Sequence, residues 1–78
     1  MVCKVVGIKN VDYVSKKTGR NVKGTELHVL YNDNNVAGKA VDKIYCGQNI
    51  VLKDVHIDCE IDVFYNKFGQ VDFVQNLD

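Results

Sequence analysis

The sequence predicts an all-β fold, a small five-stranded barrel with at most one short helix, and the composition gives the first reason. Fourteen Val, five Ile, four Tyr, three Phe and two Thr stand against four Leu, two Ala and one Met. Because β-branched and aromatic side chains pack well on a pleated surface, this excess favours strands. The second reason is periodicity. Apolar and polar residues alternate over several short segments, and no segment has the period of a long amphipathic helix.

The length of the chain, 78 residues, predicts one domain spanning residues 1–78. A chain of this size buries only about 60% of its unfolded surface, so we expect it to gain stability as a homodimer. Lysines interrupt the apolar residues at the N-terminus, and no apolar run is long enough to span a membrane. Together with three cysteines, an odd number, this predicts a soluble cytoplasmic protein with reduced thiols and no membrane partner.

The first predicted strand is "VCKVVGIKNVDYV", residues 2–14, and it changes phase along its length. Val2, Val6 and Ile8 fall on one face, whereas Val11 and Tyr13 fall on the other parity. Such a change requires an extra residue, a bulge or a sharp bend, and Gly7 and Asn10 bracket the place where we expect it. A bent first strand can serve two sheets, as a small barrel requires.

The next two predicted strands are "TELHVLYN", residues 25–32, and "AVDKIYC", residues 40–46. The first alternates Leu27 and Val29 against polar neighbours, which is the period of a strand. The "NDNN" between the two strands has turn chemistry, because Asn and Asp tolerate left-handed backbone. The segment 48–58 is ambiguous, and we expect either a short helix or an extended connector.

A hairpin closes the chain, with "CEIDVFYN" and "QVDFVQ" as strands around "NKFG". Gly69 stands where the turn needs a left-handed residue. The alternation places Ile61 and Val63 on one face of the first strand, and Val71 with Phe73 on one face of the second. Five such strands, with a bent first one, are typical of the OB-fold, a Greek-key barrel that binds oligonucleotides. A generic β-barrel or an SH3-like barrel is the alternative.

One short stretch, "SKKTGRNVKG" at residues 15–24, concentrates positive charge in a chain whose net charge is zero. Two glycines in it leave the backbone free to turn. Flexible cationic loops hold polyanion backbones by releasing counterions, without reading sequence. The alternative is a solvated loop that is basic only for solubility. The candidate phosphate-binding residues are Lys16, Lys17, Arg20 and Lys23.

Aromatic residues near this stretch favour nucleic acid as the partner. Single-stranded nucleic-acid binders combine a basic groove with aromatic side chains on which bases stack. Tyr13 precedes the basic stretch, Tyr31 ends the strand that follows it, and Phe68 occupies the tip of the last hairpin. Core packing or cross-strand pairing is the alternative role for each tyrosine, and Tyr31 shares the parity of Leu27 and Val29.

The segments "YVSKKTGRNVKGTELHVLY" and "VFYNKFGQVDFVQ" resemble the small single-stranded DNA-binding, helix-destabilising proteins of phages. The resemblance extends over most of the chain. It implies an OB-type barrel that dimerises and coats single strands during DNA replication. It also implies that residues 15–24 form the DNA-binding loop, with Tyr13, Tyr31 and Phe68 as the stacking residues.

Metal binding and catalysis have weaker support in the sequence. Three cysteines and two histidines supply zinc-ligand types, but none falls in the paired spacing of a zinc site. No nucleophile, base and orienting group occur together, and there is no phosphate-binding glycine motif. We therefore expect no enzyme activity, no catalytic residues, no metal and no cofactor. The function that competes with nucleic-acid binding is a small phage or mobile-element protein-interaction module.

Overall fold

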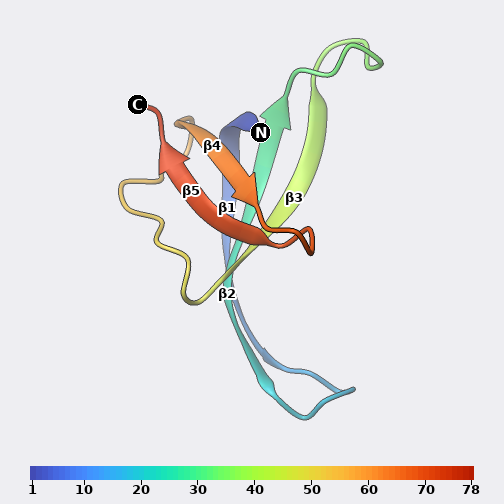
Figure 1. Cartoon of the computed structure of the whole chain (residues 1–78), viewed down its shortest axis with the longest axis vertical. Helices are drawn as coiled ribbons and strands as arrows, with labels where there is room; N and C mark the ends of the chain where they lie inside the picture. The colour runs from blue at the N-terminus through green and yellow to red at the C-terminus, as the bar shows by residue number, and fades with distance from the viewer.

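The computed structural model describes residues 1–78 as one antiparallel sheet of five strands without a helix (Figure 1). The all-β prediction is confirmed, and residues 48–58 form turns rather than a helix. No element of the structure is a helix that could cross a membrane. The strands are β1 (Val2–Val14), β2 (Asn21–Tyr31), β3 (Ala40–Gly47), β4 (Glu60–Tyr65) and β5 (Val71–Asn76).

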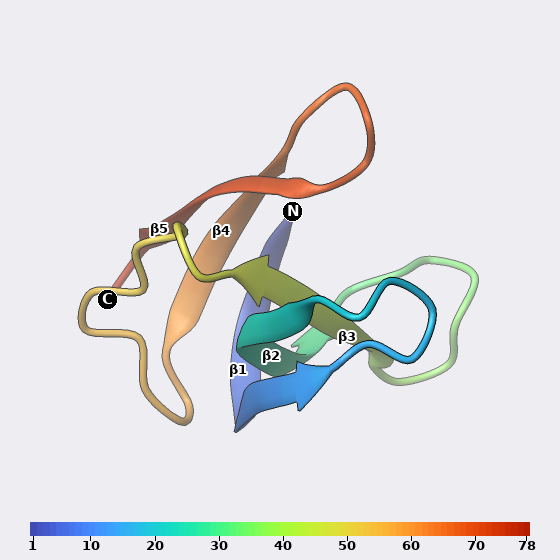
Figure 2. The same cartoon turned by 90° about the horizontal axis from the view of Figure 1, so that it is seen from below.

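The sheet curls toward a barrel but is not closed (Figure 2). Its order is β3-β2-β1-β4-β5, so β1 lies at the centre and β3 and β5 are the two edges. These edges come near one another, but no hydrogen-bonded ladder joins them. The arrangement is consistent with a small barrel of the OB type that has an open seam between β3 and β5.

The core lies between the curled halves of the sheet and is small. Leu27 and Val29 point inward from β2, as their alternation predicts, and Ile61 and Val63 do the same from β4. β1 contributes residues of odd number near its start, whereas Val2 and Val6 point outward. The buried cluster consists of Cys3, Val5, Leu27, Val29, Ile44, Cys46, Cys59, Ile61, Val63 and Val74.

Two irregularities decide which side chains reach this core. The pairing of β1 with β2 shifts between Val5 and Gly7, so the expected change of phase is present but lies before Gly7 and not between Gly7 and Asn10. As a result Ile8 pairs with the buried Leu27, and the prediction that it shares a face with Val2 and Val6 is wrong. A second shift falls in the β4–β5 pair, where Asp72 is an extra residue on β5. Because of it, Val74 is buried and Phe73 is exposed, so the prediction that Val71 and Phe73 share one face is wrong.

Beyond the barrel, β1 and β2 continue alone as a two-stranded projection, which we call the arm, residues 12–23 (Figure 1). β3 ends at Gly47, opposite Gly24, and β4 pairs only with the first residues of β1. No third strand therefore covers the arm. Its residues are exposed except Ser15 and Val22, which are half-buried.

Candidate nucleic-acid interface

The tip of the arm is a tight turn made by residues 15–20. The backbone N–H of Ser15 donates to the carbonyl of Arg20, and the N–H of Gly19 donates to the carbonyl of Ser15, both at 2.8 Å. Gly19 has a φ of 68°, in the left-handed region that favours glycine. The predicted loop of residues 15–24 is therefore shorter in the structure, and its last four residues belong to β2.

Three cations stand together on this turn. Lys16, Lys17 and Arg20 are exposed, and none of them takes part in an ion pair. Lys23 lies further along the arm, opposite Asp12 in the strand register, and is also exposed and without an ion pair. The tip consequently presents positive charge that no acidic group of the chain neutralises at close range.

The side of β1, β2 and β3 that points away from the core is called the outer face. Tyr13 lies on it at the arm, opposite Val22, and its side chain is 56% exposed. Further toward the barrel, the register places Lys9, Glu26 and Tyr45 in one row. Tyr13, Val22 and Lys9 thus lie on one surface that begins at the cationic tip.

Tyr45 is a candidate that sequence reasoning did not select. Its hydroxyl donates to the carbonyl of Lys23 at 2.9 Å, which draws the ring across Gly24 at the base of the arm. A Cβ on Gly24 would lie 2.8 Å from that hydroxyl and would overlap the carbonyl oxygen of Cys46. The ring nevertheless remains 46% exposed. Tyr45 therefore offers a fixed aromatic surface at the base of the arm.

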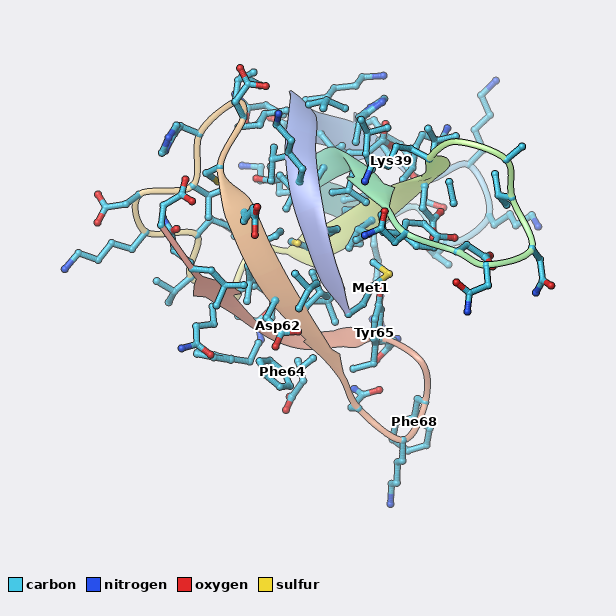
Figure 3. All side chains as sticks on the ribbon, turned by 90° about the horizontal axis from the view of Figure 1, so that it is seen from above. Met1, Lys39, Asp62, Phe64, Tyr65 and Phe68 are labelled. Carbon is cyan, nitrogen blue, oxygen red and sulfur yellow. The ribbon has the colours of Figure 1, made fainter.

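The other two predicted aromatics differ in their surroundings. Tyr31 is half-buried and packs against the core, in keeping with its shared parity with Leu27 and Val29. Phe68 is 74% exposed at the outer end of the β4–β5 hairpin, where the Lys67 Nζ lies 5.2 Å from its ring centre (Figure 3). Tyr13 and Phe68 are therefore accessible to a ligand, and Tyr31 contributes to packing.

A groove of about 550 Å³ runs along the open seam between β3 and β5. Asp42, Lys43 and Tyr45 line it from β3, and Tyr65 and Asp72 line it from the opposite hairpin. Burial, and to a smaller extent the Asp42 carboxylate, raises the pKa of the Tyr65 phenol above its usual value. The lining of the groove therefore combines two tyrosine rings with the exposed carboxylates of Asp42 and Asp72.

The cysteines lie away from these surfaces. Cys3, Cys46 and Cys59 are buried and unpaired, and burial raises the pKa of the Cys3 and Cys46 thiols above their usual value. No group of three His, Cys, Asp or Glu residues is arranged to hold a metal ion. Comparison with known protein families, curated proteins and solved structures finds no match to this chain.

Proposed function

We propose that the protein binds single-stranded nucleic acid, and DNA in particular, with little regard to sequence. The observation that carries the proposal is the arm, on which three unpaired cations stand at the tip and an exposed Tyr13 stands on the outer face. Phosphates bind to such cations through release of counterions, and bases stack on such rings. Both kinds of contact use exposed side chains, so the arm can make them although it has no buried core.

The bases are proposed to follow the outer face from the arm toward the β4–β5 hairpin. In Figure 1 the arm extends below the barrel, and the turn of this hairpin lies at the right of the barrel, above the tip of the arm. Tyr13, Tyr45 and Phe68 are the exposed rings along this route. Each stacked base contributes about 1–3 kcal/mol, so three rings would supply affinity that does not depend on base identity.

A second copy of the chain is proposed to pack on the outer side of β4 and β5. Phe64 (Figure 3) and Phe73 lie opposite one another there, with ring centres 5.8 Å apart, and are 44% and 53% exposed. Lys53 and Asp54 line a hollow beside Phe73, so the surface carries both signs of charge. A surface of this kind can complement its own copy across a two-fold axis.

The exposed area of the chain supports such pairing. A compact monomer of 8.8 kDa should expose about 4,800 Å². This chain exposes 5792 Å². The excess is about 1,000 Å², which is comparable to the ~800 Å² that each partner buries in a typical interface.

The proposed activity is binding without catalysis. The three unpaired cysteines support a reducing compartment, such as the cytoplasm, as the place of action. Membership of the phage helix-destabilising group, and a role in DNA replication, are proposed on the sequence resemblance alone. A protein-interaction module is the competing function, and the exposed Phe64–Phe73 pair is the observation that favours it.

A titration with end-labelled oligo(dT) at low and high salt tests the proposed function. We expect saturable binding that weakens as salt rises, because the arm contacts are ionic. A duplex of equal length serves as the control and should bind less tightly, since its bases are unavailable for stacking. Absence of binding to any single strand at low salt contradicts the proposal and favours the interaction module.

A further inference from the structure

The groove at the open seam has a charge that does not suit phosphate. Asp42 and Asp72 are both exposed within it, against a single cation, Lys43. The backbone N–H of Lys43 donates to one carboxylate oxygen of Asp42 at 2.7 Å, which leaves the second oxygen available. The two carboxylates repel a phosphate backbone, so the part of a nucleic acid that could occupy this groove is the base.

Nucleobases carry the complementary chemistry. An ionised carboxylate only accepts hydrogen bonds, so it selects bases that present donor groups. In a single strand the Watson–Crick edges are free, and guanine there offers adjacent N1–H and N2–H₂ donors to the oxygens of one carboxylate. Cytosine and adenine offer one amino group each. Thymine offers only N3–H, flanked by carbonyl oxygens that a carboxylate repels.

We propose that the seam between β3 and β5 is a base-reading site that favours amino-bearing bases, guanine above all, over thymine. This inference rests on the proposed single-strand binding and adds a modest base preference to it. Asp42 and Asp72 accept hydrogen bonds from the base, and Lys43 faces the adjoining phosphate. Binding elsewhere on the chain remains independent of sequence.

The walls of the groove suit a flat aromatic ligand. Tyr45 lines one side from β3, and Tyr65, which is 44% exposed, lines the other from the end of β4. The raised pKa of Tyr65, caused by burial and then by Asp42, is consistent with a phenol held near that carboxylate. Gln70 adds an exposed side-chain amide to the lining, and an amide can both donate and accept.

The site also lies on the proposed path of the single strand. Tyr45 borders both the outer face near the arm and the seam groove. Asn66 and Gly69 of the β4–β5 turn line the groove too, and Phe68 lies between them in the chain. A strand that leaves the arm toward Phe68 therefore passes the groove, where one base can turn inward.

The test uses oligothymidine of about eight nucleotides, within the usual range of about 4–16 nucleotides for one such barrel, with a single central substitution. A guanine guest should bind roughly fivefold or more tightly than all-thymine, as one base-edge contact allows. A hypoxanthine guest keeps the purine ring but lacks the 2-amino group. The hypoxanthine strand should lose most of the guanine advantage. This comparison separates the contribution of the 2-amino hydrogen bond from that of purine stacking.

The double variant Asp42→Asn, Asp72→Asn should reduce the guanine advantage to less than about twofold, because a side-chain amide can pair with thymine as readily as with guanine. The control is Glu60→Gln, which removes one exposed carboxylate from β4 outside the groove. It should keep the full advantage while raising the affinity for every oligonucleotide slightly.

Equal affinity for guanine, hypoxanthine and thymine guests in the wild type overturns the base-reading site. An undiminished guanine advantage in the double variant overturns the role of the two carboxylates. In both cases binding to all-thymine strands persists, and the proposed function stands. Loss of binding to every strand is the different outcome that removes the proposed function itself.

Discussion

The hydroxyl of Tyr45 donates a hydrogen bond to the carbonyl of Lys23, 2.9 Å away, and so ties the end of β3 to the base of the arm. The contact depends on Gly24, because a side chain there would occupy the space that the ring crosses. The arm has no third strand to hold it, so this bond is a tertiary contact between its base and the barrel.

Replacing Gly24 by Ala should therefore destabilise the protein by about 1–3 kcal/mol, the usual cost of overpacking. The new Cβ would overlap the backbone carbonyl of Cys46, which cannot move without disturbing the β2–β3 ladder. Gly47→Ala is the matched control, since it lies opposite Gly24 and meets only the side chain of Asn49. Urea denaturation measures both variants, and equal costs would contradict the explanation.

Neutralising the cations of the arm should flatten the salt dependence of binding. If Lys16, Lys17, Arg20 and Lys23 each hold one phosphate, the slope of log affinity against log salt falls in magnitude by about 0.7 for each. The quadruple glutamine variant should thus lose up to about 3 from the slope. Lys39→Gln is the control and should leave the slope unchanged, because Lys39 is exposed and lies next to Ala40, which pairs with Tyr31 at the opposite end of β2 from the arm.

Removing an aromatic ring should weaken binding without changing the salt slope. Tyr13→Ala and Phe68→Ala should each cost about 1–3 kcal/mol of affinity for oligo(dT), because one stacked base is lost. Both rings are exposed, so the free energy of unfolding should change little. Tyr31→Ala provides the contrast, since its ring packs on the core and its loss should lower stability first.

Introducing polar residues at Phe64 and Phe73 should separate the proposed homodimer. The double serine variant removes the aromatic pair from the outer side of β4 and β5 without reaching the core. Sedimentation at micromolar concentration should report twice the 8.8 kDa chain mass for the wild type and the single mass for the variant. A monomeric wild type under these conditions rules out the pairing.

Alkaline pH should destabilise the fold through its buried thiols. Burial raises the pKa of Cys3 and Cys46 above the ordinary thiol value of 9.0, so the unfolded chain loses these protons first. The stabilising difference is complete below the unfolded pKa and is lost as pH rises through the folded pKa. The free energy of unfolding should therefore fall as the pH rises above the unfolded value of 9.0 and continue to fall until the higher folded pKa is passed. Cys46→Ala should show a shallower fall, and an identical pH profile would exclude this origin.

The strands could be predicted from the sequence because alternation is a local property. Residues 2–14 form one strand with a bulge near Gly7, as the change of phase requires. The same reasoning failed at Phe73, because the extra residue in β5 leaves no trace in a six-residue segment. A phase shift can be recognised only when enough residues lie on both sides of it.

The cationic tip was predictable for the same local reason, whereas the surfaces beside it were not. Lys16, Lys17 and Arg20 are neighbours in the chain, so composition alone reveals them. Tyr45 lies more than twenty residues from Lys23, and their contact depends on the register of β2 with β3. The seam groove depends on how far the sheet curls, which no periodicity encodes.

The absence of a third strand along the arm makes its length adjustable. Because its residues pair only with each other, one residue can be added to each strand together without moving any part of the barrel. Each such pair lengthens the reach by about 3.4 Å and reverses the face that the residues beyond it present. Two pairs restore the original facing. Insertions in the arm could thus change how far the tip extends and which side its residues face, while the structure of the barrel stays the same.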